Sequence, residues 1–305
     1  MSRIAAGIDI GGTKIAIGLV DEQGTVLAQS TLKTDLSLTP KEMLGRTASE
    51  VRRLAEELGI PHSSLEGVGV GAPGPLNTKE GILTCPPNLK SWWGFPVVAE
   101  LQELLSLPVK MENDATAATL AEKWVGAAQD SEHFVFITIS TGIGAGIYLH
   151  GKLITGNTGN TGDAGFMFVH PQGDVVHGEP SGYWEQIASG TAIARAASEM
   201  LGRQVSTKEV FDQAAAGDPA MTELTERVYT YIGMGCVSLI NLLDPAKIVI
   251  GGGVSQVGEP LFSAVRAYVA KHALNPSGRE TAIVPAQLQQ NAGLIGAAAL
   301  IQQPY

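Results

Sequence analysis

The chain has 305 residues, of which 44% are hydrophobic and 16% charged, and its formal net charge is −10. No apolar run approaches the ~18 residues that a membrane span requires, and the acidic balance argues against nonspecific binding of nucleic acid. The two cysteines, Cys85 and Cys236, have neither a disulfide framework nor metal-site spacing. A strand is expected almost at the N-terminus, which leaves no room for a signal sequence. We therefore expect a cytoplasmic protein with no membrane and no nucleic-acid partner.

Three strands are expected to open the chain, over residues 4–10, 15–20 and 25–31. A helix follows, because Thr39 is a favourable N-cap, Pro40 suits the first helical position and Glu42 completes a capping box. Apolar strands are expected at 68–73 and 108–114, and the helical sequence "ATAATLAEKWVG" follows the second of them. Strands that alternate with helices predict an α/β fold with a largely parallel sheet.

The second half of the chain restarts this scheme. The segment 134–154, "FVFITISTGIGAGIYLHGKLI", is again strand, glycine turn and strand. Asp218 and Pro219 open a long helix that reaches toward Leu243, and a small-residue helix at 291–301 closes the chain. Two domains built on one plan would leave a cleft between them, and small-molecule sites form preferentially in such places.

The first glycine turn lies in "GIDIGGTKIAIGLV" and offers Asp9, Gly11, Gly12, Thr13 and Lys14. Such a turn is typical of a structural hairpin. It is equally typical of a phosphate loop, in which backbone N–H groups and the Thr13 hydroxyl donate to phosphate oxygens while Asp9 holds a metal ion or its water. The loop is not a Walker A motif, because that spacing is absent.

Two further glycine runs suit a nucleotide. The turn of the second half, "STGIGAG" at 140–146, contains a GxGxG pattern. Gly251, Gly252 and Gly253 follow a short buried strand, and we expect them to begin a helix, whose N-terminus favours a phosphate. A helix cap alone would need only one glycine.

The sequence "ENDA" places Asn113 and Asp114 where a strand ends and a helix begins. An Asp at this position is often a helix N-cap. It is also suited to act as a general base, which takes the proton from an attacking hydroxyl while the neighbouring amide orients that hydroxyl.

Two loops rich in glycine, asparagine and aromatic residues cover 86–96 and 156–166. Asn88, Asp163 and Glu185 are placed to hydrogen-bond a polyol in a fork pattern, although each loop is also typical of solvated surface.

Taken together, these segments are too specific to be generic. In chain order they read "GIDIGGTKIAIGLVD", "GVGAPGPLN", "NLKSWWGFP", "ENDATAATLAE", "ISTGIGAGI", "GNTGDAG" and "DPAKIVIGGGVS". The set resembles the ROK family of sugar kinases in the actin-like ATPase superfamily, and most closely its glucokinase and amino-sugar kinase members. The resemblance implies a two-domain actin-like (ribonuclease H-like) α/β fold with an interdomain cleft. It implies domains over 1–113 with the C-terminal helix at about 291–305, and over 114–290.

The same resemblance implies ATP- and Mg²⁺-dependent phosphorylation of a hexose at the 6-hydroxyl by a homodimer. Asp114 would be the base. The residues expected around the sugar are Gly74, Asn88, Asn113, Asp114, Gly162, Asp163, Phe166 and Glu185. Those expected at the nucleotide and its phosphates are Asp9, Gly11, Gly12, Thr13, Lys14, Thr141, Gly142, Gly252 and Gly253, with Asp9 also holding Mg²⁺ directly or through water.

The sequence departs from the family pattern at two places. Asp163 and Phe166 stand where the family carries the glutamate and histidine of "ExGH", and "VVHGEPSGYWE" replaces the cysteine-rich zinc motif. His170 and His177 have no cysteine partner, so we expect no zinc and a loop held instead by packing through Tyr183 and Trp184. Loss of the histidine should relax selection at the sugar and admit glucose, glucosamine, N-acetylglucosamine and mannose-type substrates.

Three other functions compete with this one. A repressor of the family would need an N-terminal helix-turn-helix domain, for which there is no space before Gly7. A non-catalytic sugar sensor would be expected to lose the base, yet Asp114 is present. A polyphosphate-dependent glucokinase stays open, because the choice of donor depends on surface charge that sequence order does not place.

Overall fold

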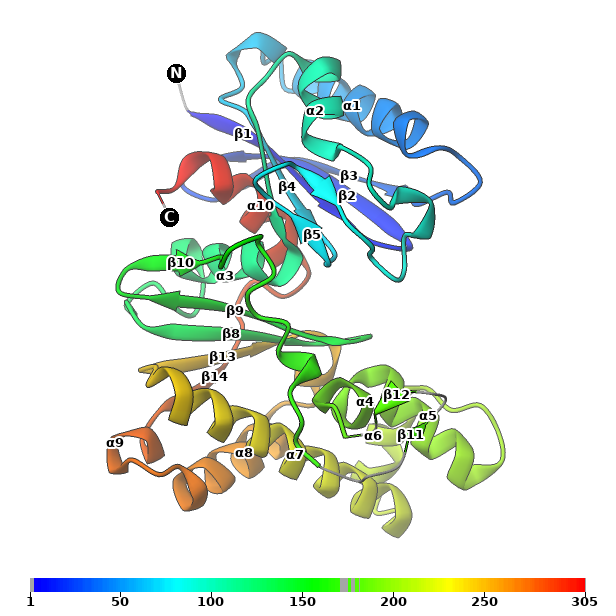
Figure 1. Cartoon of the computed structure of the whole chain (residues 1–305), viewed down its shortest axis with the longest axis vertical. Coiled ribbons are helices and arrows are strands. Elements are labelled where there is room, and N and C mark those ends of the chain that lie inside the picture. The colour runs from blue at the N-terminus through cyan, green and yellow to red at the C-terminus, as the bar shows by residue number, and fades with distance from the viewer. Residues whose placement is uncertain (1–2, 171–174, 177–178, 181, 305) are drawn as a thin grey trace. The chain divides into compact units, whose positions relative to one another are not determined.

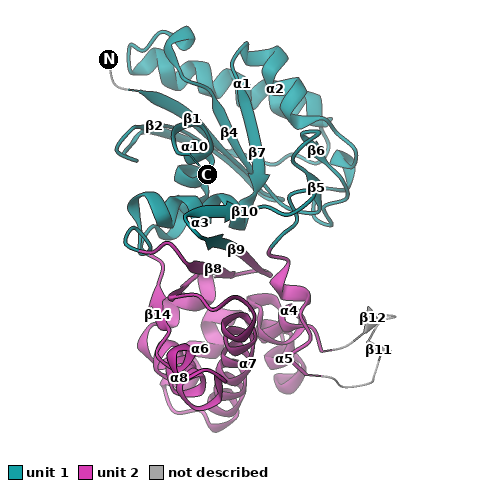
Figure 2. Cartoon of the chain, turned by 60° about the vertical axis from the view of Figure 1, so that its left-hand side comes forward, with its two compact units in different colours: residues 1–130, 146–161, 287–305 teal, residues 131–145, 162–286 magenta. Residues whose placement is uncertain are grey.

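The computed structural model describes residues 3–170, 175–176, 179–180 and 182–304 (Figure 1). The chain divides into two compact units (Figure 2). Unit 1 comprises Met1–Asp130, Gly146–Thr161 and Gln287–Tyr305, and unit 2 comprises Ser131–Ala145 and Gly162–Ala286. The domains expected from the sequence are a different division, in which residues 114–130 belong to the second part; that division stays a prediction.

Unit 1 contains a five-stranded sheet with the strand order β3-β2-β1-β4-β7. The strands are β1 (Ile4–Ile10), β2 (Lys14–Asp21), β3 (Val26–Lys33), β4 (Val68–Ala72) and β7 (Val109–Asn113). The first three pair antiparallel, whereas β1, β4 and β7 run parallel. The three opening strands, the strand after the first helix and the strand of "ENDA" are thus confirmed, with ends shifted by one or two residues.

Helices cover both faces of this sheet. They are α1 (Pro40–Glu57), α2 (Val97–Leu105), α3 (Asp114–Val125) and α10 (Ala292–Gln302). The predicted capping box is present, since the Thr39 hydroxyl accepts from the backbone of Glu42 and the Glu42 carboxylate accepts from Thr39. On the face of α10, Gly7 and Gly69 have no side chain, and a Cβ at either position would collide with the α10 backbone. The small-residue helix therefore packs directly on the strands.

The second five-stranded sheet has the order β10-β9-β8-β13-β14. Its strands are β8 (Phe134–Ile139), β9 (Ile143–Leu149), β10 (Lys152–Ile154), β13 (Lys247–Gly251) and β14 (Ala282–Pro285). The chain passes from unit 2 to unit 1 within β9, after Ala145. Two-stranded ribbons are formed by β5 (Leu76–Asn77) with β6 (Ile82–Leu83), and by β11 (Val175–Val176) with β12 (Glu179–Pro180).

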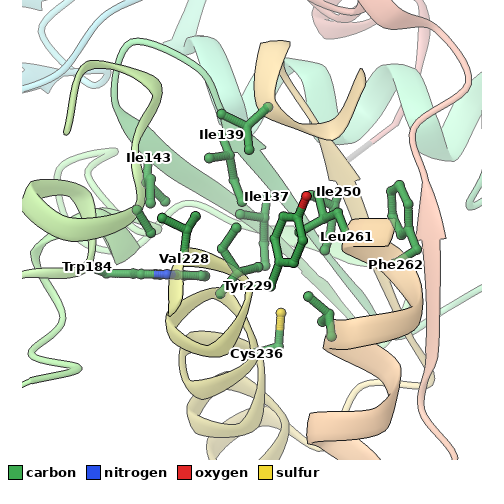
Figure 3. Packing of buried hydrophobic residues seen from close by; sticks show 14 of the residues in the cluster. Ile137, Ile139, Ile143, Trp184, Val228, Tyr229, Cys236, Ile250, Leu261 and Phe262 are labelled. Carbon is green, nitrogen blue, oxygen red and sulfur yellow. The ribbon is translucent and has the colours of Figure 1, made fainter. Parts of the chain in front are cut away.

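The rest of unit 2 is largely helical. These are α4 (Trp184–Ala188), α5 (Gly190–Leu201), α6 (Thr207–Ala215), α7 (Pro219–Leu243), α8 (Glu259–His272) and α9 (Pro276–Arg279). The long helix begins where the sequence predicts, because the Asp218 carboxylate accepts from the backbone N–H of Met221 at 3.0 Å. Cys236 of this helix is buried in the core, and burial raises the pKa of its thiol to about 12, so the cysteine is a packing residue (Figure 3).

Trp184 anchors the end of the segment that replaces the family's cysteine-rich zinc motif. Its ring is fully buried in the same core and lies against α7, where a Cβ at Gly235 would collide with the indole (Figure 3). The packing expected for Trp184 is therefore present. Short helices of the 3₁₀ type lie at His62–Ser64, Lys90–Trp92, Ala164–Phe166, Gly253–Val257 and Gln289–Asn291.

Candidate active site

The first glycine turn, which is expected to bind phosphate, connects β1 and β2 in unit 1. The backbone N–H of Gly11 donates to the Lys14 carbonyl at 2.9 Å, which closes the turn. Thr34, the residue after β3, holds the turn in place, because its hydroxyl donates to the Gly11 carbonyl at 2.7 Å. Thr13 and Lys14 are exposed. A Cβ at Gly12 would lie 3.0 Å from the Cβ of Asn88, so the turn packs against a residue expected at the sugar.

Asp9 stands near the end of β1, with glycines around its carboxylate. Burial raises the pKa of Asp9, and the charge of Lys14 opposes that effect. A Cβ at Gly293 of α10 would collide with the Asp9 carboxylate, and a Cβ at Gly71 of β4 would lie 3.7 Å from Asp9 Oδ1 and 3.7 Å from the Cα of Asp114. These glycines let the sheet, α10 and the start of α3 approach one another around a carboxylate.

Asn113 and Asp114 lie at the N-terminus of α3, where Asn113 is the N-cap and Asp114 is the first helical residue. Asn113 is the N-cap of α3, and its Oδ1 accepts from the backbone N–H groups of Ala115 at 2.9 Å and Thr116 at 3.3 Å. Asp114 is the first residue of the helix and is exposed, with Oδ1 accepting from Ala115 at 2.7 Å. The N-cap interpretation of Asp114 was therefore wrong, because the preceding amide takes that place.

Gly74 and Asn160 lie next to this helix start. A Cβ at Gly74 would lie 3.5 Å from the Asn113 Nδ2 and 3.6 Å from the Asn160 Oδ1. Asn160 pairs with the backbone of Leu76 in β5, since it accepts from that N–H at 2.9 Å and donates to that carbonyl at 2.7 Å. Sequence reasoning missed Asn160, because an asparagine in a glycine-rich loop carries no signal for such a contact.

In unit 2, Glu185 brings two glycine segments together. Its Oε2 accepts from the backbone N–H of Ile143 at 2.7 Å, and a Cβ at Gly142 would collide with this carboxylate. A Cβ at Gly165 would lie 3.1 Å from the Cβ of Glu185. Desolvation raises the pKa of Asp163, which begins the same turn. The carbonyl of Gly162 accepts from the backbone of Ala145 at 2.8 Å and fixes the start of this turn.

A large pocket of about 1220 Å³ lies within unit 2. Helices α5, α6 and α7, the glycine turn after β13 and the start of α8 form its walls. Its lining includes Ser140, Thr141, Lys208, Phe211, Glu226, Tyr229, Gly253, Gln256, Val257 and Pro260. The rings of Phe211 and Tyr229 are parallel, with centroids 6.3 Å apart. Thr141 and Gly253 were predicted at the nucleotide; the helical residues were missed, because they form no short motif.

The glycine run after β13 differs in part from the prediction. Gly252 has a φ of 85°, and a Cβ there would collide with the backbone of Ile139, so the fold itself requires a glycine. Gly253 has open space around its Cα and begins a short 3₁₀ helix rather than an α-helix. The α-helix expected here, α8, begins only at Glu259.

Metal ligands are sparse in the part of the chain that the structure describes. No group of three or more His, Cys, Asp or Glu residues gathers there in a geometry that would hold a metal ion. The His170 ring packs on Tyr231 with centroids 5.6 Å apart, and His177 lies outside the described residues. The Asp9 carboxylate beside the first glycine turn fits Mg²⁺, which binds through one or two carboxylates together with substrate phosphates and water.

Three known proteins illustrate what this chain is similar to. The glucokinase of Thermotoga maritima is 32% identical, over 97% of this chain and 96% of the relative. The N-acetylmannosamine kinase of Citrobacter koseri is 35% identical, over 99% of both chains. A solved structure of a ROK family glucokinase from Streptomyces griseus, in complex with glucose and AMPPNP, matches with a TM-score of 0.82 and 33% identity over 99% of this chain and 100% of that one.

The family relationship follows from these matches. The similarity to the solved structures confirms the actin-like ATPase fold that was expected from the resemblance. The model of the ROK family matches residues 5–304, nearly the whole sequence. The chain belongs to the ROK family.

Proposed function

We propose that this chain transfers the γ-phosphoryl group of ATP to the 6-hydroxyl of a hexose. It is a sugar kinase, since it matches glucokinases and an N-acetylmannosamine kinase over their full length. The observation that carries the proposal is the pair at the start of α3. Asn113 caps the helix, and the Asp114 carboxylate beside it is exposed, as a base that takes a proton from a bound substrate must be.

In the proposed reaction, Asp114 accepts the proton of the 6-hydroxyl as its oxygen attacks the γ-phosphorus. The bond from that phosphorus to the bridging oxygen breaks, and ADP leaves. The Thr13 hydroxyl and the backbone N–H groups of the first glycine turn donate to phosphate oxygens. Mg²⁺, held by Asp9 directly or through water, would neutralise charge on the phosphates.

The pocket of unit 2 supports a nucleotide as the donor. Much of its lining is apolar, including the parallel rings of Phe211 and Tyr229 with Val257 and Pro260. A polyphosphate chain has no base or ribose to desolvate there, whereas adenosine does. The AMPPNP bound by the related glucokinase is consistent with ATP. This pocket favours ATP over polyphosphate, and retention of Asp114 disfavours a non-catalytic sensor.

Acceptor specificity is proposed to be broad. Phe166 is exposed and offers no hydrogen-bonding edge, and Asp163 reaches one carbon less far than a glutamate. A site that makes few polar demands rejects analogues weakly. Relatives of this chain are named glucokinase, N-acetylmannosamine kinase and, in Listeria monocytogenes, beta-glucoside kinase. We therefore propose glucose, glucosamine, N-acetylglucosamine and mannose-type acceptors within about two orders of magnitude in kcat/KM.

A cytoplasmic homodimer belongs to the same proposal. Among the residues that the structure covers, no helix is long and apolar enough to cross a membrane. Light scattering on the purified chain tests the dimer.

The activity itself is tested with a matrix of the four sugars against ATP and polyphosphate, at saturating Mg²⁺. Sugar-dependent ADP release, with no product from polyphosphate, is the expected result. Product from polyphosphate alone would refute the assignment of the donor, and a preference for glucose above about a thousandfold would refute the relaxed acceptor site.

A further inference from the structure

Tyr229 of α7 has a hydroxyl without a partner in the wall of the unit 2 pocket. The residue is only 8% exposed and lines that pocket. Within the part of the chain that the structure describes, its hydroxyl makes no hydrogen bond. Figure 3 shows the ring rising from α7 with the hydroxyl at the end away from Cys236. A buried hydroxyl without a partner is costly, whereas phenylalanine would fill the same space without that cost, so the hydroxyl indicates a ligand that supplies the partner.

The surroundings of this hydroxyl favour an uncharged acceptor. Desolvation raises the pKa of Tyr229 to about 12, so the group keeps its proton at neutral pH and is available as a donor. Phe211, Val257 and Pro260 are apolar parts of the same lining. A phosphate placed among them would lose its hydration without compensation, whereas a ring nitrogen of a base would not carry that penalty.

Most other polar side chains of the pocket are already engaged with the protein. Three hydroxyls donate to backbone carbonyls at 2.6, 2.7 and 2.9 Å, those of Thr207, Thr222 and Thr225. Lys208 donates to the Asp212 carboxylate at 2.6 Å. Glu226 and Gln256 are exposed to solvent. The pocket therefore makes few fixed polar demands on the exocyclic groups of a base, which are the groups that distinguish adenine from guanine.

We propose that Tyr229 selects a purine as the base of the phosphoryl donor, through a hydrogen bond from its hydroxyl to a ring nitrogen that adenine and guanine share. This inference rests on the proposed function and adds GTP to its donors. The rings of Phe211 and Tyr229 are parallel to within 2°, so a base packed flat on Phe211 is parallel to Tyr229 as well. Both purines carry N7 as an acceptor in the plane of the ring.

Two physical effects separate purines from pyrimidines in this pocket. A purine has the larger flat face to pack on aromatic and apolar side chains. A pyrimidine has no imidazole ring, so its acceptors lie at other positions and do not replace N7. Adenine and guanine, in contrast, differ at exocyclic groups that meet no fixed partner, and a site that makes few polar demands rejects analogues weakly.

Binding without a sugar tests Tyr229 separately from catalysis. Calorimetry with Mg²⁺ and the imido analogues of ATP, GTP and CTP should show that the two purine analogues bind within about tenfold of each other, and the CTP analogue at least about tenfold more weakly. Tyr229→Phe should weaken both purine analogues by about three- to tenfold and leave the CTP analogue and inorganic tripolyphosphate unchanged. The unliganded variant should unfold at the wild-type temperature or above it, because the hydroxyl has no protein partner to lose. Tyr268→Phe, at a half-buried tyrosine of α8 outside the pocket lining, is the matched control and should keep all wild-type affinities.

Equal affinities of the wild type for all three nucleotide analogues, or unchanged purine affinities in Tyr229→Phe, would overturn the inference. An equal loss for the CTP analogue would place the hydroxyl on the ribose and overturn it too. The same preparation is then assayed with glucose and ATP. Transfer to glucose without selective purine binding would refute this inference and leave the proposed function intact. Selective purine binding without transfer to any sugar would support the role of Tyr229 and refute the kinase reaction.

Discussion

At the scale of single residues, the start of α3 separates a structural role from a chemical one. Asn113 satisfies the free N–H groups of the first turn, which is what an N-cap does. Asp114 is the first residue of the helix, and its exposed carboxylate also accepts from the Ala115 N–H, at 2.7 Å through Oδ1.

Asp114→Asn should lower turnover by about 10²–10⁴-fold, the usual effect of losing a general base. Sugar affinity should change far less, because the amide preserves size and polarity. Asp218→Asn is the matched control: it replaces a carboxylate that caps α7, where asparagine caps equally well, so turnover should not change. A variant at residue 114 that keeps more than about a tenth of wild-type turnover would rule out the base.

Glu112 gives a second prediction at this scale, because it is a carboxylic acid in an apolar position. Its side chain on β7 is only 5% exposed, and burial raises its pKa from 4.5 to about 7. Between these two values the unfolded chain has released the proton and the folded chain has not. Stability should therefore fall as pH rises through this window and level off above it.

Glu112→Gln removes this ionisation. Near about pH 8 the variant should be more stable than the wild type, by at most about 3 kcal/mol, and near about pH 4 the two should be equal. Urea unfolding at both pH values measures the effect. If Glu112→Gln instead lowers the free energy of unfolding equally at both pH values, ionisation of Glu112 does not destabilise the folded chain.

At the scale of elements, one buried carboxylate of unit 1 accepts hydrogen bonds from two separate segments of the chain. Glu122 of α3 is 0% exposed, and it accepts from the backbone N–H groups of Ala127 at 2.7 Å, Gln287 at 3.1 Å and Leu288 at 3.0 Å. A Cβ at Gly126 would collide with this carboxylate, which explains the glycine four residues later. Glu122 thus joins the end of α3 to the segment that leads into α10.

Glu122→Gln should destabilise unit 1 by about 2–4 kcal/mol, because an amide cannot accept all three bonds and buried N–H groups become orphaned. Hydrogen exchange at Gln287 and Leu288 should accelerate with it. The control Glu223→Gln, on an exposed position of α7, should change stability by less than about 0.5 kcal/mol. Unchanged hydrogen-exchange rates at both amides would show that Glu122 does not hold this segment in place.

The helices and strands also show which parts of the structure can be predicted from the sequence. Strands, the capping box of Thr39 and Glu42 and the long helix followed from local patterns, because caps and apolar periodicity act within a few residues. The contacts of Glu122 with Gln287 and of Asn160 with Leu76 join residues that are far apart in the chain. Such contacts depend on how the folded chain packs, so no local sequence motif predicts them. The helical residues that line the pocket of unit 2 likewise belong to no short motif, whereas Thr141 and Gly253 of that lining stand in glycine-rich turns that were expected at a nucleotide.

At the scale of the whole molecule, turnover by the proposed kinase requires Mg²⁺. Removal of divalent ions with a chelator should abolish sugar-dependent ADP release, and added Mg²⁺ should restore it. Asp9→Asn should raise the Mg²⁺ concentration needed for half-maximal turnover, because one carboxylate ligand is lost. Full activity in the chelated enzyme would contradict this. Elemental analysis of the purified chain, expected to show no zinc, should accompany the assay.

The most direct test of the central claim is the identity of the product made from glucose, ATP and Mg²⁺. Phosphorus and carbon NMR should show one sugar phosphomonoester, with the phosphate on the oxygen of C6 and with ADP formed in equal amount. This is the result predicted when Asp114 takes the proton of the 6-hydroxyl. Phosphate on any other oxygen, or ADP formed without a sugar phosphate, would contradict the account.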